Sequence, residues 1–315
     1  MQSDYNNYII TVHKSPTQLK RLIDKLDAPN QFFYIHVDLK ADLDSFKNVI
    51  SQKNVYFIPD RVNCIWGDYS LTQAALKLIK KVLNSETKGR MTLLSGQDYP
   101  IKPTVYINDF LQQYADYDFI SYTLDPVDEQ SELYLSRVKK YKFNLSERKK
   151  DYLLLPPLFD LTKRDIKKVI GNTFNGRFNP IHLKEIFTRN RKSPFANHYK
   201  GSNWWSFQLS TAQKIFDYYT KHQSILDTYY RRTLISDELF FHTLLRQIEK
   251  ESGSPFNTLP YLHFVDWSKK NVPLPVTFRK EDLNLLLNQP EDKLFARKFD
   301  IDEDEEILDL LDDHL

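Results

Sequence analysis

Two rhythms of apolar residues alternate along the first 125 positions of the chain. Short apolar runs, each bounded by polar residues, are typical of buried strands. Between them, apolar residues recur at spacings of three and four, as in the helix that Pro16 opens and in the segment 70–83. Repeated in units of about 30 residues, these patterns predict an α/β fold with a mostly parallel central sheet flanked by helices. The predicted strands cover 8–12, 32–37, 55–58, 92–94 and 119–121.

The pattern is less regular after residue 125. An irregular, basic, proline-containing stretch leads to a predicted strand at 204–209 and to predicted helices around 211–220 and 237–249. The last sixteen residues hold nine acidic residues and no Lys or Arg, and they predict a terminal helix over 305–311 with a frayed tip. We therefore expect one large domain, or two interlocked ones.

Composition narrows the class of protein. The 19 Tyr and 21 Phe residues favour a protein that lines grooves with amphipathic rings, as sugar-binding clefts often do. A single cysteine, Cys64, excludes an intramolecular disulfide framework and a cysteine-based metal site. The start at Met1 has no signal-peptide pattern, and no apolar stretch reaches the roughly 18 residues of a membrane span, which predicts a soluble cytoplasmic protein.

Positive charge is concentrated in one segment. Residues 142–200 carry fourteen Lys and Arg against five Asp and Glu, an excess of nine positive charges. Such an excess can indicate nucleic acid, an anionic lipid surface or an anionic substrate as partner, or only a solvated face. The segment lacks the regular aromatic interleaving of a stacking platform, so we do not expect nucleic acid.

The run Leu93–Lys102 holds the first candidate for chemistry. An apolar strand ends at Ser95 and Gly96, and the carboxylate of Asp98 follows before Pro100. Because ligands of open α/β sheets bind at the carboxyl ends of strands, Asp98 is expected at the rim of a pocket. The alternative is a carboxylate that caps the following turn.

Glycine-rich phosphate loops and metal-binding motifs are missing from the sequence. Neither a G-x-G-x-x-G nor a G-x-x-x-x-G-K pattern occurs. An Asp-x-Asp pair at a strand exit could hold a divalent ion on a diphosphate, but Asp116 and Asp118 precede their predicted strand. Asp42 and Asp44 lie at a polar helix start. We expect both pairs on the solvated surface.

A second candidate lies in Ser236–Leu245. Ser236 or Asp237 is predicted to be the N-cap of a helix, with Glu238 in its first turn. A glutamate there can simply complement the helix dipole. Alternatively, Glu238 is a general base at the mouth of a cleft.

Seven short motifs occur along residues 8–300 in the order found in the core-2/I-branching enzymes, which the chain resembles. That family comprises inverting β-1,6-N-acetylglucosaminyltransferases, and the peptide O-xylosyltransferases belong with it. The resemblance implies a GT-A-like fold that uses a UDP-sugar without a metal ion. The motifs are Tyr34–Lys40, Cys64–Ser70, Ser95–Lys102, Gly201–Trp205, Ser236–Glu238, Phe264–Trp267 and Phe295–Phe299.

The resemblance also assigns roles to residues on the donor side. Asp38 resembles the residue that contacts the uracil, with Thr11 and Trp66 at neighbouring nucleotide positions. Asp98 resembles the carboxylate that holds the donor sugar. Lys298 matches a basic residue on the diphosphate, where a fixed cation can stabilise the departing UDP.

On the acceptor side, Glu238 falls on the family's catalytic base, which removes the proton of the attacking hydroxyl. Trp267 matches an acceptor-side tryptophan and Arg137 an acceptor-contacting arginine. A second diphosphate-binding arginine has no clear counterpart. The candidates for its place are Lys269, Lys270, Arg279 and Arg297.

Together these features predict a bacterial, metal-independent, inverting glycosyltransferase without a cofactor. Its predicted donor is UDP-N-acetylglucosamine and its acceptor a glycan or lipid-linked saccharide, joined through a β-linkage (β-1,6 by the resemblance). UDP-xylose is the alternative donor, and a non-catalytic carbohydrate-binding protein is the alternative class. Residues 1–125 would bind the nucleotide-sugar, residues 126–300 the acceptor and catalytic groups, and 301–315 would form an acidic tail. The basic segment predicts peripheral contact with the inner face of an anionic membrane.

Overall fold

The computed structural model describes residues 5–315, so the expectation drawn from Met1 lies outside the described residues. Its centre is a seven-stranded sheet with the order β12-β6-β11-β4-β1-β2-β3. Only the two joints that β11 makes, with β6 and β4, are antiparallel, and the other four are parallel. The predicted α/β architecture with a mostly parallel sheet is confirmed. These strands are β1 (Asn6–Val12), β2 (Gln31–Val37), β3 (Val55–Phe57), β4 (Arg90–Ser95), β6 (Asp118–Phe119), β11 (Ser206–Gln208) and β12 (Thr258–Leu259).

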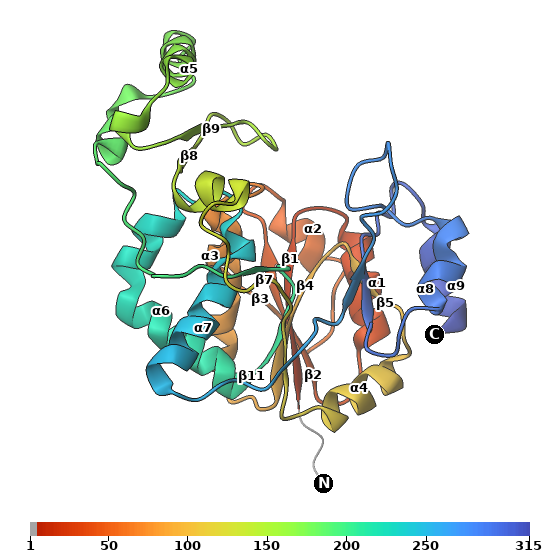
Figure 1. Ribbon diagram of the computed structural model, residues 1–315. Coiled ribbons are helices and arrows are strands. Elements are labelled where there is room, and N and C mark those ends of the chain that lie inside the picture. Colours follow the sequence, from red (N-terminus) through yellow and green to blue (C-terminus); the bar gives the residue numbers. More distant parts are fainter. Residues whose placement is uncertain (1–4) are drawn as a thin grey trace.

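Helices cover both faces of this sheet, with α1, α8 and α9 on one side and α3, α6 and α7 on the other (Figure 1). The side chains of β1 alternate accordingly: Tyr8 and Ile10 face the first group and Ile9 the second. The helices are α1 (Pro16–Leu26), α2 (Leu43–Lys47), α3 (Tyr69–Leu83), α4 (Thr104–Gln113), α5 (Lys163–Phe174), α6 (Leu209–Tyr230), α7 (Phe240–Ser252), α8 (Leu283–Leu287) and α9 (Glu306–His314).

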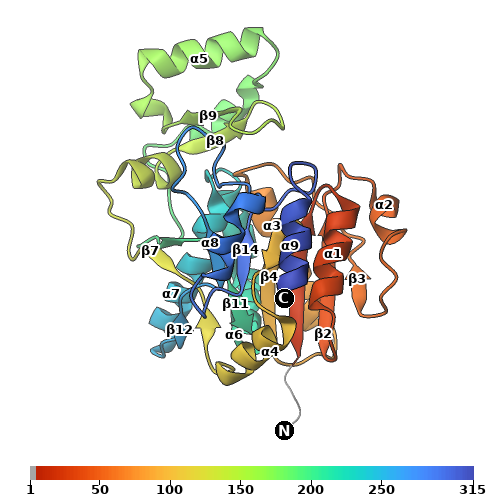
Figure 2. The ribbon, with the colours of Figure 1, turned by 90° about the vertical axis from the view of Figure 1, so that its right-hand side faces the viewer.

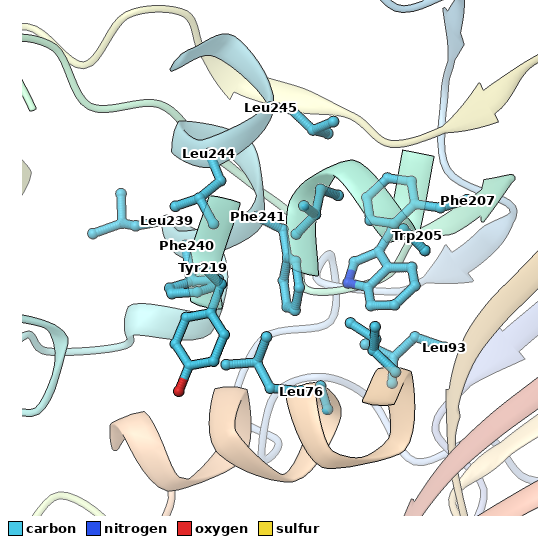
Figure 3. Close-up of a cluster of buried hydrophobic side chains, with 14 of the residues drawn as sticks. Leu76, Leu93, Trp205, Phe207, Tyr219, Leu239, Phe240, Phe241, Leu244 and Leu245 are labelled. Atoms are coloured by element: carbon cyan, nitrogen blue, oxygen red, sulfur yellow. The ribbon is translucent and has the colours of Figure 1, made fainter. Parts of the chain in front are cut away.

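Large aromatic rings fill the core between the sheet and helices α6 and α7 (Figure 3). Trp205 stacks on Phe207 with ring centroids 4.3 Å apart and meets Phe241 at 5.0 Å. All three side chains are buried. Of these three, Trp205 and Phe207 lie in the segment predicted as strand, Trp205 just before β11 begins at Ser206.

Short strands outside the main sheet tie distant parts of the chain together. Strands β13 (His263–Val265), β14 (Phe295–Arg297) and β5 (Asp98–Pro100) form a three-stranded sheet. In this sheet, Arg297 of β14 pairs with Asp98 of β5, a residue of the first candidate motif. A two-stranded sheet pairs β7 (Tyr122–Leu124) with β10 (Lys200–Gly201).

The acidic C-terminal segment packs as helix α9 against α1. Three of its side chains, Ile307, Leu308 and Leu311, are fully buried. Arg21 of α1 pairs with Asp309 and Asp312, each at 2.7 Å. The predicted terminal helix is confirmed, and it continues to His314, through the positions where fraying was predicted.

Residues 141–191 form a projecting lobe in place of the irregular stretch that the sequence predicted. It contains the hairpin β8 (Tyr141–Asn144) and β9 (Tyr152–Leu155), helix α5 and two short 3₁₀ helices. A small core of its own holds it together, which includes Phe143, Leu155 and Phe178. The lobe stands above the edge at which β1, β2 and β4 end, and α5 is its outermost element (Figures 1 and 2).

Candidate active site

The carboxyl ends of β1, β2 and β4 are stitched together by backbone hydrogen bonds. Asp38 N–H donates to the Val12 carbonyl at 2.7 Å, and Gly96 N–H donates to the Thr11 carbonyl at 3.0 Å. A Cβ on Gly96 would lie 2.6 Å from Val12 Cγ2, so only glycine permits this approach. Thr11, Asp38 and the Ser95–Asp98 turn, predicted from separate motifs, therefore meet at one edge.

Asp98 lies beneath this edge and is fully buried. Its Oδ2 accepts the Ser95 N–H at 2.6 Å, and its Oδ1 accepts a hydrogen bond from Arg297 Nη1 at 3.0 Å. Burial raises the pKa of Asp98, but the Arg297 charge and the nearby His263 ring outweigh burial, so its pKa lies below the ordinary value. The carboxylate is charged, and its hydrogen bonds fix its position. The prediction that Asp98 lies at the rim of a pocket is wrong, because the side chain is fully buried. Its predicted role toward the donor sugar stays a prediction.

Arg297 is fixed from three sides. Besides Asp98, it donates to Ser95 Oγ, and its guanidinium lies 4.9 Å from the ring centroid of Trp204. Trp204 in turn stacks on His263 at 4.9 Å. This packing makes Arg297, only one of four candidates from the sequence, the cation that the fold positions most firmly beside Asp98.

Glu238 forms a second charged cluster. Its Oε2 lies 2.8 Å from Arg137 Nη1 and 3.2 Å from Lys200 Nζ, and 29% of its side chain is exposed. Within the described residues, Oε1 accepts no hydrogen bond. Arg137, predicted to contact the acceptor, is thus brought to the predicted base. The backbone of Arg137 is held by buried Arg191, which donates to its carbonyl at 3.0 Å.

The predicted N-cap at Ser236 or Asp237 is wrong. Residues Ser236–Glu238 form a 3₁₀ turn, and α7 begins at Phe240. The turn follows Ile235, which has a left-handed backbone (φ 51°) and donates its N–H to the Gly67 carbonyl at 2.9 Å. This contact anchors the Glu238 turn to the Trp66 motif. A local helix pattern could not show it, because the partner lies far away in the chain.

The short segment 200–204 contacts both the Glu238 cluster and the Asp98–Arg297 cluster. Lys200 pairs with Glu238, and four residues later Trp204 packs on Arg297. Four residue steps span at most about 14 Å between the Cα atoms of Lys200 and Trp204, so the two clusters are close in space. Gly201 is required here, since a Cβ would lie 2.2 Å from His242 Nε2.

Positive charge gathers between these clusters without a carboxylate to balance it. Lys298 follows Arg297 and forms no ion pair within the described residues. Lys149, at the tip of the β8–β9 hairpin, lies 5.0 Å from the ring of Trp66. Partial burial, and then the charges of Lys150, Lys298 and Arg297, lower the pKa of Lys149. Mutual repulsion of this kind indicates a site suited to an anion.

The chain is similar to known proteins over nearly all of its length. Residues 7–287 match the family model described as Core-2/I-Branching enzyme. The chain belongs to the Core-2/I-Branching enzyme family. It is 26% identical to xylosyltransferase 2 of Rattus norvegicus over 332 residues and 25% identical to the xylosyltransferase of Ciona intestinalis over 327 residues. These alignments cover 98% and 97% of this chain, but the chain spans only about a third (33%) of the length of each relative.

Among solved structures, the apo form of mouse xyloside xylosyltransferase 1 aligns with 93% of this chain and 97% of its own, at 10% identity and a TM-score of 0.37.

Two of the cations considered for the diphosphate in this Core-2/I-Branching family member are already neutralised. Lys269 Nζ lies 2.6 Å from Asp282, and Arg279 lies 3.2 Å from Glu303 with 55% of its side chain exposed. Lys270 and Trp267 lie on the exposed loop after β13, and Trp267 is 60% exposed. Arg297 is also paired, with Asp98, but its side chain is only 22% exposed and it adjoins Lys298. The geometry therefore favours Arg297 and Lys298 over Lys269 and Arg279 as the cationic pair.

The prediction that Asp116 and Asp118 both lie on the solvated surface is wrong for Asp118. Its side chain is buried and accepts hydrogen bonds from Gln208 N–H and Thr211 Oγ1, both at 2.7 Å. It therefore caps the start of α6 from the neighbouring strand. Asp116 is exposed as predicted, and Asp42 is the N-cap of α2.

The sequence analysis missed Lys149, Lys200, Trp204 and His263 as site residues. Lys149 was counted only as part of a basic run, although its place between two aromatic strands was visible. Lys200 precedes the motif Gly201–Trp205 and Trp204 lies within it, and this was the available signal. For His263, no local pattern distinguishes a residue under the site from an ordinary core histidine.

Proposed function

We propose that this protein is a metal-independent, inverting glycosyltransferase that moves a sugar from a UDP-sugar onto a hydroxyl of a glycan or lipid-linked saccharide. One observation carries the proposal. Two carboxylates, Asp98 and Glu238, lie in neighbouring charged clusters, and Lys149 and Lys298, which form no ion pair within the described residues, lie close to Arg297. This combination suits a reaction in which a base activates one oxygen while a diphosphate leaves with negative charge.

Glu238 is the proposed base. Arg137 and Lys200 hold its Oε2, which orients the carboxylate and leaves Oε1 for the acceptor hydroxyl. The oxygen loses its proton to Glu238 as it attacks the anomeric carbon from the face opposite UDP, which gives a β-linked product. A positioned base of this kind contributes about 10²–10⁴-fold in rate.

Lys298, Lys149 and Arg297 would stabilise the departing UDP. Their positions are set by the fold: Arg297 by Asp98 and Trp204, Lys149 by Trp66. Fixed cations need no reorganisation when charge develops on the leaving group. Thr11, Asp38 and Trp66 would hold the nucleotide at the strand ends, and Trp267 would contact the acceptor.

Two donors remain in the proposal. The family resemblance favours UDP-N-acetylglucosamine, whereas similarity to xylosyltransferases favours UDP-xylose. Measuring UDP release from a panel of UDP-sugars, with and without oligosaccharide acceptors, decides between them. Release with neither donor, together with tight UDP binding, would support the non-catalytic carbohydrate-binding alternative. Cytoplasmic localisation and a bacterial source also remain proposals.

A further inference from the structure

Helix α5, the outermost element of the lobe, carries an exposed apolar stripe. Ile166 is 45% exposed, Ile170 49% and Phe174 86%. Their spacing of four residues places all three within about 80° of one another around the helix axis. A neighbouring face of the helix is buried, since Val169 packs in the small core of the lobe. The stripe is thus left over after the lobe has formed its core.

Four cations accompany the stripe on the same helix: Lys163, Arg164, Lys167 and Lys168. All four are exposed, and none forms an ion pair within the described residues. The helix's single acidic residue, Asp165, is engaged in a capping box with Thr162. An apolar strip beside unpaired Lys and Arg is the pattern of helices that lie in the interface of an anionic bilayer.

The acidic C-terminal residues do not balance the positive charge of α5. Those acids instead pair elsewhere: Asp300 with Lys14 at 2.5 Å, Asp309 with Arg21 at 2.7 Å and Glu306 with Lys280 at 2.9 Å. The positive charge of α5 therefore remains available for a partner from outside the chain.

We propose that α5 docks this protein onto an anionic lipid surface, with Ile166, Ile170 and Phe174 inserted into the headgroup region and Lys163 and Lys167, which flank the stripe, over the lipid phosphates. Within the described residues, no helix has the length and apolarity to cross a bilayer, so the contact is peripheral. Because α5 lies above the edge where the site's strands end, the docked face would be the face on which the site opens (Figure 1). The inference stands on the lobe alone and does not depend on the proposed activity.

Sedimentation with vesicles tests it. The protein should pellet with vesicles of phosphatidylcholine and phosphatidylglycerol at 3:1 in low salt and stay in solution with phosphatidylcholine alone. Salt at about 1 M should release it, because the Debye length shrinks to about 3 Å. The triple variant Ile166→Ser/Ile170→Ser/Phe174→Ser and the quadruple variant Lys163→Ser/Arg164→Ser/Lys167→Ser/Lys168→Ser should each lose at least tenfold in vesicle affinity.

Matched controls keep the test sharp. Val105→Ser removes an apolar side chain that is 73% exposed on α4, and Lys80→Ser/Lys81→Ser removes two exposed cations from α3. Both should bind vesicles like the unmodified protein, and circular dichroism should show all variants folded. Equal binding to neutral vesicles, binding unaffected by the triple variant, or a stripe that only mediates self-association would each overturn the proposal.

Discussion

The strand-end site and helix α5 both carry exposed positive charge, but they hold it differently. In the site, Arg297 is bonded to Asp98 and Ser95, and Arg137 is bonded to Glu238, so these guanidiniums are oriented by the protein itself. On α5, four cations have no acidic partner within the described residues. Cations with partners are held for geometry, and cations without partners are free to bind a ligand.

The hairpin tip joins the two regions. Lys149 belongs to the lobe by sequence but lies against Trp66 and close enough to Lys298 for their charges to repel. Nearby Glu147 accepts a hydrogen bond from Asn63 at 2.5 Å and so holds the tip over the site. The basic segment is therefore two functional groups of residues, one facing the site and one facing outward.

The largest effect is expected from the base. Glu238→Gln should lower turnover by roughly 10²–10⁴-fold, because the amide cannot accept the acceptor proton, while UDP binding should stay near normal. The exposed Glu86→Gln, at the opposite end of the sheet, should change neither quantity. Steady-state rates and calorimetric UDP binding measure both. Near-normal turnover of Glu238→Gln would reduce this residue to a structural partner of Arg137.

The next effect separates the cations at the site, Lys149 and Lys298, from the cations on α5. Lys149→Ala and Lys298→Ala should each weaken UDP binding by about 1.5–3 kcal/mol, the range for a hydrogen bond to a charged group. That corresponds to roughly 10- to 100-fold in affinity. Lys167→Ala on α5 should leave UDP affinity unchanged. An equal loss of UDP affinity in all three variants would mean that these cations act together as one diffuse positive surface.

A smaller effect concerns Asp118, which forms with Asp116 an Asp-x-Asp sequence like those that bind metal ions. Asp118→Ala should cost about 1–3 kcal/mol in the free energy of unfolding, because the Gln208 N–H and the Thr211 hydroxyl lose their buried acceptor. Asp116→Ala, at an exposed position, should cost almost nothing. Urea unfolding measures both. Loss of Mn²⁺ binding as the main consequence would return the pair to a catalytic role.

The most subtle effect is a pH trend next to the base. Burial, and then the Glu238 charge, raise the pKa of Asp237 from 3.8 to about 7. The stability that this group contributes is complete below about pH 4 and is lost as the pH rises through 7. Asp237→Asn should therefore gain stability relative to the unmodified protein between pH 4.5 and 8 in urea titrations. A parallel gain in the exposed control Asp109→Asn would contradict this explanation.

Elements that depend on local patterns could be predicted from the sequence. Strands β1, β2 and β4 and helix α3 begin and end within two residues of their predicted bounds, and α1 begins at Pro16 as predicted, because each buries a continuous apolar run or face. The motifs also brought together residues that follow or end strands, and Thr11 and Asp38 lie side by side at the ends of β1 and β2.

What could not be predicted depends on partners far away in the chain. The turn at Glu238 exists because Ile235 bonds to Gly67, and Asp98 is covered because β14 returns to pair with β5. The lobe was obscure for another reason: its core is small, and several large apolar side chains, such as Phe159, Ile170 and Phe174, stay exposed.

The central claim is that fixed cations replace a metal ion in stabilising the leaving diphosphate. UDP release from the preferred UDP-sugar, measured in excess EDTA and then after addition of Mn²⁺, tests it most directly. We predict an unchanged rate in EDTA, no stimulation by Mn²⁺, and a loss of rate in Lys298→Ala that Mn²⁺ does not restore. Complete loss of activity in EDTA, recovered with Mn²⁺, would contradict the claim.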